Sequence, residues 1–215
     1  MLTLGAAVAL AAGLTVFAAN DTIATDKAAA SAKAKAAAET TETAIFAGGC
    51  FWCVESDFDK VDGVLDTESG YTGGTTENPT YKSVTYGDSG HYEAVRITYD
   101  PSVVDYRTLV NHFFRTVDPT DDGGQFCDRG HSYRTAIFAV DADQRAIAED
   151  EKAVADEILG GTVVTPIIDA SAFTRAEEYH QDYYLTNPLR YRYYRYACGR
   201  DDRVKELWGE EKPAG

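Results

Sequence analysis

Positive charge is scarce in this sequence of 215 residues, which carries 20 lysines and arginines against 35 aspartates and glutamates. The formal net charge is −15. A surface that binds nucleic acid neutralises phosphates with clustered lysine and arginine side chains. The composition therefore argues against a nucleic acid as partner, and we attribute the acidic balance to solubility.

A second C-x-x-C pair is also missing, and no segment of the chain repeats. The four cysteines are Cys50, Cys53, Cys127 and Cys198, and only the first two form such a pair. Zinc sites with four thiolate ligands usually combine two C-x-x-C pairs. The spacing therefore argues against a zinc site, and no metal or cofactor is expected.

Charged side chains are absent from residues 2–19, where small apolar residues dominate. This run, with the small-residue stretch "VFAAN" near its end, is typical of an export signal, although the usual basic start is missing. Its length would also just suffice for an uncleaved membrane anchor. We predict a signal peptide or membrane anchor at 1–19 and a flexible linker at 20–42. The protein is then exported, either periplasmic or membrane-anchored and facing the periplasm.

Residues 43–215 are predicted to form one domain, long enough to bury a core. Apolar runs and alternation predict strands at 43–48, 64–74, 91–100, 133–141 and 162–169. Apolar spacings of three and four predict helices that begin at Cys50, at 106 and at 143. The order β-α-β-β-α-β-α-β predicts an α+β two-layer sandwich, with a mixed, largely antiparallel sheet and packed helices around a ferredoxin-like β-α-β-β-α-β core.

Three finer expectations concern the second half of the chain. The strand at 162–169 is expected at a sheet edge, because Pro166 cannot donate a backbone hydrogen bond. In the helix at 143–159, Ile147, Val154 and Ile158 are expected to face inward. After Asn187 we expect an irregular C-terminal tail that ends in a short helix near "DDRVKELWG".

The stretch "AGGCFWCVES", residues 47–56, contains the first candidate reactive group. Cys50 falls between a predicted strand and a predicted helix, and the glycines before it let the backbone turn sharply. Free amides at a helix N-terminus stabilise a thiolate and lower the pKa of the thiol. Because the thiolate is the nucleophilic form, Cys50 is predicted to be the nucleophile.

The strand "HYEAVRITYD", residues 91–100, contains the second candidate. Alternation places Glu93 on the same face as Val95 and Ile97, which is the apolar face. Burial there disfavours the charged form, so the pKa of Glu93 should rise and the group should stay protonated near neutral pH. The alternative is a buried ion pair between Glu93 and an arginine.

"GGCFWCVES" closely resembles the G-C-F-W-x-x-E signature of the A-type peptide methionine sulfoxide reductases. The resemblance continues through "GYTGG" (70–74), "NPTY" (78–81), "GHYEAVRITYDP" (90–101), "FFRTVDPT" (113–120), "DRGHSYRTAIF" (128–138) and "AEEYHQDY" (176–183). It covers essentially all of residues 44–198. It implies that the domain reduces the S epimer of methionine sulfoxide, free or in proteins, in the repair of oxidised proteins. It also implies a thioredoxin-type reductant, and we expect a monomer.

The resemblance assigns roles to residues of this sequence. The Cys50 thiolate attacks the sulfoxide sulfur and becomes a sulfenic acid, while Glu93 protonates the departing oxygen. Tyr81, Tyr133 and Asp128 occupy the family positions around that oxygen. Phe51 and Trp52 are expected to hold the methyl group of the substrate.

A second thiol must then condense with the sulfenic acid to form an intramolecular disulfide. The chain departs here from the commonest family pattern, because Cys53 replaces a glycine that many members have. We favour Cys198 as the resolving thiol, because loop closure costs little for a tail and a Cys50–Cys53 bond would bend the first helical turn. Cys53 or Cys127 remain alternatives, either as direct resolver or as relay.

Two other classes of protein remain open. In one, the four cysteines form two disulfides that staple a binding domain without activity. In the other, the C-x-x-C pair belongs to a thiol–disulfide oxidoreductase that acts on disulfides rather than on sulfoxides.

Overall fold

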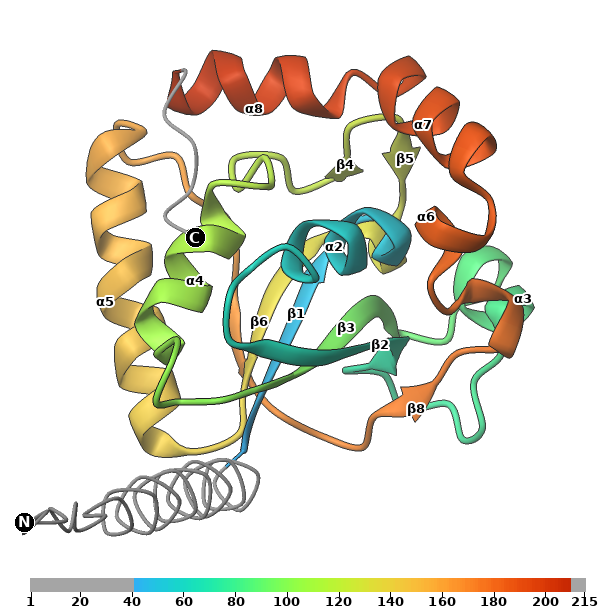
Figure 1. Ribbon diagram of the computed structural model, residues 1–215, viewed down its shortest axis with the longest axis horizontal. Helices are drawn as coiled ribbons and strands as arrows, with labels where there is room; N and C mark the ends of the chain where they lie inside the picture. The colour runs from blue at the N-terminus through green and yellow to red at the C-terminus, as the bar shows by residue number, and fades with distance from the viewer. Residues whose placement is uncertain (1–40, 210–215) are drawn as a thin grey trace, which may run out of the picture. The chain divides into compact units, whose positions relative to one another are not determined.

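The computed structural model of the chain describes residues 41–209 (Figure 1). The export segment predicted at 1–19 lies outside the described residues, as does the predicted linker up to residue 40. Within the described part of the chain, no helix combines the length and the apolar character needed to cross a membrane.

A six-stranded sheet forms the centre of the domain. Its strands, in spatial order, are β7 (Ile167–Asp169), β6 (Thr135–Ala139), β1 (Glu42–Gly48), β3 (Tyr92–Tyr99), β2 (Val64–Thr72) and β8 (Thr174–Arg175). Only the pairing of β6 with β7 is parallel. The predicted α+β class, with its mixed and largely antiparallel sheet, is confirmed, and β7 lies at the edge, as Pro166 suggested.

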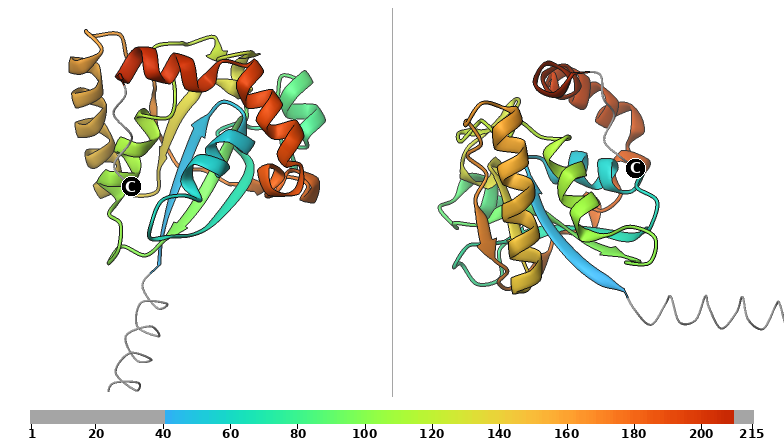
Figure 2. Two further views of the ribbon diagram at one scale, coloured as in Figure 1. Left: turned by 45° about the horizontal axis from the view of Figure 1, so that its top comes forward. Right: turned by 90° about the vertical axis from the view of Figure 1, so that its left-hand side faces the viewer.

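Three helices cover one face of this sheet: α2 (Phe51–Phe58), α4 (Tyr106–Phe114) and α5 (Ala142–Ile158). Phe46 of β1 lies at the centre of the core beneath them. Its ring stacks on Phe58 of α2 at 5.2 Å and on Phe113 of α4 at 5.0 Å between centroids. Figure 2 shows α4 and α5 lying side by side next to the sheet. Figure 1 also labels a small ribbon of β4 (Gly124–Gln125) and β5 (Asp128–Arg129).

Helix α5 buries a different face from the predicted one. Its buried positions are Gln144, Ala148, Glu151 and Ala155. Val154 and Ile158, which we expected to face inward, are 47% and 54% exposed. The two alanines belong to the main core, and their small side chains let α5 approach α4 closely. The larger apolar residues are therefore displaced to the rim of the contact.

The tail also differs from expectation, because it is helical over most of its length. It forms α6 (Tyr183–Thr186), α7 (Pro188–Ala197) and α8 (Arg200–Trp208). Pro188 suits the first position of α7, and Gly199 takes a left-handed conformation (φ 66°) that turns the chain into α8. Figures 1 and 2 show α7 and α8 running past one end of the sheet, where α2 begins. The tail therefore lies close to the predicted nucleophile.

Candidate active site

Cys50 lies between the end of β1 and the start of α2, as predicted. Gly49 before it has a φ of 84°, and a Cβ there would lie 2.6 Å from the side chain of Gln125. Only glycine fits this turn without displacing a neighbour. Cys50 is the N-cap of α2 with an extended ψ of 118°, and its carbonyl oxygen accepts a hydrogen bond from the amide of Cys53 at 3.0 Å. The backbone of Cys50 is therefore anchored to the first turn of α2, while its own conformation is not helical.

The two cysteines of the C-x-x-C pair are both free and both buried. The two thiols are hydrogen-bonded to each other. Burial raises the pKa of Cys50 well above its usual value, and the neighbouring Cys53 and Glu93 add to the rise. The pKa of Cys53 is lowered by the hydrogen bond with Cys50, and the charges of Arg200 and Arg195 act in the same direction against desolvation. The predicted lowering of the pKa of Cys50 is therefore wrong for this arrangement, because desolvation outweighs the helix N-terminus.

Glu93 lies on β3 directly below the start of α2 and is 1% exposed. Its Oε2 accepts a hydrogen bond from the amide of Phe51 at 3.2 Å. Burial raises the pKa of Glu93 to about 8, and the Phe51 amide and the Tyr133 hydroxyl offset only part of that rise. The prediction of a protonated acid near neutral pH agrees with this environment, which offers an amide and a phenol to the carboxyl group.

Tyr81 and Tyr133 come together beside Glu93. Tyr133 ends a short 3-10 helix, His131–Tyr133, and Tyr81 begins α3 (Tyr81–Tyr86). The two phenols interact with each other, and burial raises the pKa of both, with the charge of Glu93 adding to the rise. Both hydroxyl groups therefore stay neutral and able to donate hydrogen bonds near the carboxyl group.

Asp128 lies on β5, and its carboxylate already accepts a hydrogen bond within the protein. Its Oδ2 accepts a hydrogen bond from the hydroxyl of Tyr194 on α7. Burial raises the pKa of Asp128, and this hydrogen bond lowers it in part. The Tyr194 hydroxyl also interacts with Cys50, so one phenol from the tail covers both groups. The sequence-based site lacked Tyr194, and the only signal for it was the unusual density of tyrosine and arginine after residue 187.

Phe51 and Trp52 occupy different surroundings. The Phe51 ring is 1% exposed and packs against His180 at 4.9 Å between centroids. Trp52 is half-buried, stacks on Tyr183 at 3.7 Å, and donates from Nε1 to Nδ1 of His180 at 3.1 Å. One wall of an open pocket of about 510 Å³ is therefore the Trp52 ring. The residues lining this pocket are Trp52, Cys127, Tyr183, Arg190, Tyr193, Tyr194, Ala197 and Cys198.

Cys127 and Cys198 are joined in a disulfide whose Cα atoms lie 4.9 Å apart. Both sulfur atoms lie within 4.8 Å of an Asp128 carboxylate oxygen. Cys127 is exposed, and Cys198 is half-buried at the end of α7. The four cysteines thus form an inner pair of thiols, Cys50 and Cys53, and an outer disulfide at the mouth of the site. Which cysteine resolves the sulfenic acid stays a prediction.

Comparisons with known proteins agree on one family. The family model for peptide methionine sulfoxide reductase matches residues 42–212. "Peptide methionine sulfoxide reductase MsrA 2" of Caulobacter vibrioides is 58% identical over 174 residues, covering 80% of this chain and 88% of the relative.

Solved structures of Mxr1 from Saccharomyces cerevisiae are also similar to this chain. The reduced form has a TM-score of 0.67 and 32% identity, over 70% of this chain and 87% of the other. The same yeast protein in complex with Trx2 has a TM-score of 0.50 and 24% identity, over 67% of this chain and 86% of the other.

Proposed function

Because this chain belongs to the peptide methionine sulfoxide reductase family, as an oxidoreductase that reduces methionine sulfoxide to methionine, we propose that Cys50 attacks the substrate. The substrate is the S epimer, either free or in oxidised proteins under repair. The observation that supports this proposal best is the convergence of Cys50 and Glu93 at the N-terminus of α2. Cys50 caps that helix, and Glu93 accepts a hydrogen bond from its first amide.

In the first step, the Cys50 sulfur gives two electrons to the sulfoxide sulfur. Glu93 donates its proton to the substrate oxygen, which ends on Cys50 as a sulfenic acid while methionine leaves. Cys50 is only 7% exposed in the structure, so α7 must move aside before a substrate side chain reaches it. That movement also removes part of the desolvation that raises the pKa of Cys50, and the helix N-terminus then favours the thiolate.

The surrounding residues orient the sulfoxide. Tyr81 and Tyr133 lie beside Glu93 and bind the oxygen. Asp128 joins them when Tyr194 withdraws its hydroxyl. Phe51 and Trp52 offer apolar surface to the methyl group. A site with donors on one side and aromatic rings on the other discriminates between epimers by shape.

We propose Cys53 as the resolving thiol in place of Cys198, which the sequence favoured, because Cys198 is bonded to Cys127 whereas Cys53 is a free thiol close to Cys50. Because Cys50 is an N-cap in extended conformation, a bond to Cys53 need not bend the helix, contrary to the objection from the sequence. Cys53 attacks the sulfenic sulfur, the Cys50–Cys53 disulfide forms, and water leaves. The reduced pair of Cys127 and Cys198 then exchanges with this disulfide. Its product is two inner thiols and one outer disulfide, which is the arrangement in the structure.

A thioredoxin-type dithiol then reduces the outer disulfide and becomes oxidised itself. Cys127 is the exposed sulfur of that bond and is the accessible point of attack. The solved complex of the yeast protein Mxr1 with Trx2 supports this class of reductant.

Single-turnover experiments on separated S and R epimers test the assignment. We expect methionine from the S epimer alone and none from the Cys50→Ser chain. The Cys53→Ser chain should form methionine and accumulate a sulfenic acid that dimedone traps. Steady-state turnover by Cys50→Ser would refute the proposal. Turnover of a protein disulfide without any sulfoxide would instead favour a thiol–disulfide oxidoreductase.

We also propose that residues 1–19 direct export and that residues 20–42 tether a monomeric catalytic domain, residues 43–215, in the periplasm. Fractionation of cells that express the full chain should place activity outside the cytoplasm. Deleting residues 1–19 should abolish that placement. Light scattering of the purified domain should give the mass of one chain.

A further inference from the structure

Arg200, the first residue of α8, carries a guanidinium group that is buried beneath the start of α2. Its side chain is 2% exposed. Nη1 donates to the carbonyl oxygen of Gly48 at 3.2 Å, Nε lies 3.7 Å from Oδ2 of Asp57, and the group lies over the Phe126 ring at 4.7 Å. Burying a guanidinium is unfavourable unless its charge and its donors are matched.

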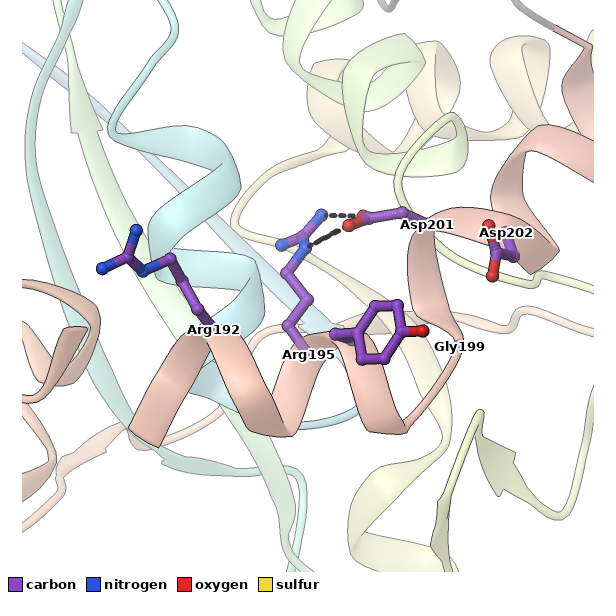
Figure 3. Close-up of a pocket in the computed structure, with 6 residues that line it drawn as sticks. Arg192, Arg195, Gly199, Asp201 and Asp202 are labelled. Atoms are coloured by element: carbon purple, nitrogen blue, oxygen red, sulfur yellow. Dashed lines mark hydrogen bonds and ion pairs between the residues drawn. The ribbon is translucent and has the colours of Figure 1, made fainter. Parts of the chain in front are cut away.

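That matching is incomplete in the structure. Nε and Nη2 of Arg200 are buried without a hydrogen-bond partner. The nearby Asp57 is shared, because its Oδ1 accepts from Nη1 of Arg195 at 2.7 Å. Arg195 is bonded in turn to Asp201, as the dashed lines in Figure 3 show. One buried carboxylate therefore serves two guanidinium groups, and Arg200 makes only the weaker contact with it.

Cys53, when ionised, can supply an acceptor and a further negative charge to Arg200 beside Asp57. It lies one helical turn before Asp57, and positions four apart share a helix face. Cys53 is 2% exposed, and the positive charges of Arg200 and Arg195 favour its ionised form while Asp57 opposes it. The titratable groups that act on Cys53 come from every neighbouring element: Cys50, Asp57, Glu93, Tyr191, Tyr194, Arg195 and Arg200.

We propose that Arg200 is a positioning residue for the resolving step, holding Cys53 as a thiolate that faces the sulfur of Cys50. This inference rests on the function proposed above. The Cys53 thiolate attacks the sulfenic sulfur of Cys50, the S–S bond forms as the S–O bond breaks, and the leaving hydroxide takes a proton from solvent to become water. No outside oxidant is needed. The C-terminal tail thus supplies, through Arg200, the positive charge that the C-x-x-C segment itself lacks.

A merely structural role for Arg200, in tying α8 to the end of β1, predicts different behaviour. It would affect the stability of the chain and every step of the reaction alike. A role through the Cys53 thiolate affects disulfide formation alone, and in a pH-dependent way. The pH profile of that one step therefore distinguishes the two.

The test uses a parent chain carrying Cys127→Ser and Cys198→Ser, in which only the inner pair reacts. In single turnovers between about pH 5 and pH 9, methionine release and Cys50–Cys53 disulfide formation are followed separately. For Arg200→Gln, which keeps a donor for Gly48 and loses the charge, we expect methionine release within about twofold of the parent. Disulfide formation should slow about tenfold at pH 7, and the midpoint of its pH profile should rise by about one pH unit. Arg200→Lys, which keeps a positive charge, should restore most of the rate.

Arg203 on the same helix provides the matched control, because its Nε bonds Asp118 at 2.7 Å away from the thiols. Arg203→Met should leave the midpoint unchanged, whereas Arg195→Gln should raise it by less than Arg200→Gln does.

An unmoved midpoint in Arg195→Gln would overturn the proposal even if Arg200→Gln failed to fold. Equal shifts in the Arg200 and Arg203 variants would overturn it too. A parent that releases methionine without forming the disulfide would refute both Cys53 as resolver and Arg200 as its partner. A parent that releases no methionine would refute the proposed function itself.

Discussion

Replacing Glu93 with glutamine should make the enzyme slower and, at high pH, more stable. Glu93 is 1% exposed, and the pKa of its carboxyl group is raised to about 8 chiefly by burial. Glutamine has nearly the same shape and can accept the same hydrogen bond from the Phe51 amide, but it cannot give up a proton to the sulfoxide oxygen. The substitution therefore separates the acid function from the packing.

The sign of the stability effect follows from proton binding. In the unfolded chain a glutamate has a pKa of about 4.3, so below that pH both states hold the proton. Between about pH 4.3 and pH 8 the folded state binds more protons than the unfolded state, and the free energy of unfolding falls by about 1.4 kcal/mol per pH unit. Across the whole window the stability lost reaches roughly 5 kcal/mol. Glu93→Gln removes that loss, so the variant should match the parent near pH 4 and exceed it at pH 8 and above.

The effect on activity has the opposite sign. General-acid assistance typically contributes about 100- to 10,000-fold, so methionine formation by Glu93→Gln should slow by that factor. In the parent, the rate should fall as Glu93 ionises above about pH 8. Glu55 on α2 offers a matched control, because it is 0% exposed and burial raises its pKa to about 8 as well. Glu55→Gln should gain stability at high pH and keep its rate of methionine formation.

The assay combines rapid-quench measurement of methionine in a single turnover with chemical unfolding at pH 5, 7 and 9. An unchanged rate in Glu93→Gln would remove the acid role. A loss of stability at pH 9 would mean that Glu93 is ionised and paired in the folded state, which contradicts the reasoning from burial.

Three further predictions concern the cysteines. Cys50→Ser should abolish methionine formation in a radiometric or colorimetric assay while leaving the thermal midpoint nearly unchanged, since the thiol is free in the fold. The fully reduced chain with all four cysteines should form about two equivalents of methionine without any reductant, because it holds two dithiol pairs. The Cys127→Ser/Cys198→Ser chain should form about one. A burst of one equivalent in both would exclude the relay. Iodoacetamide should alkylate Cys50 about tenfold faster once the outer disulfide is reduced, because that bond anchors α7 and with it Tyr194 over the thiol. Equal rates, read by mass spectrometry, would show that α7 opens regardless of the disulfide.

The parts of the site that local pattern encodes could be predicted from the sequence. The glycines before Cys50 placed it at a strand–helix junction, and the alternation of 91–100 placed Glu93 on the buried face. Both are local signals, because turn chemistry and strand periodicity depend on neighbouring residues. The antiparallel pairing of β1 with β3, which are far apart in the sequence, then brings Cys50 and Glu93 together.

What could not be predicted depends on contacts between distant segments. The pKa of Cys50 depends on burial to which Tyr194 contributes from the tail, 144 positions later in the chain. The face of α5 that points inward depends on how closely α4 approaches. That close approach leaves room for the buried alanines of α5 but not for the larger Val154 and Ile158. The helices of the tail lack a strong apolar stripe, because α7 buries only Tyr191 and is otherwise tyrosine- and arginine-rich. Their stability comes largely from docking, which no local pattern reports.

The reaction places two opposite electrostatic demands on one small site. In the proposed mechanism, Glu93 as the acid must remain neutral, which requires an environment that disfavours charge, whereas Cys53, the thiol proposed to resolve the sulfenic acid, must become charged. At the start of α2, the two groups lie in different electrostatic surroundings. On the side of β3, Glu93 meets a backbone amide and phenols that carry no net charge. One turn along the helix, the positive charges of Arg195 and Arg200 from the tail favour the ionised form of Cys53. The same burial that protonates the acid also strengthens the attraction between these guanidinium groups and a thiolate, so excluding water serves both residues at once.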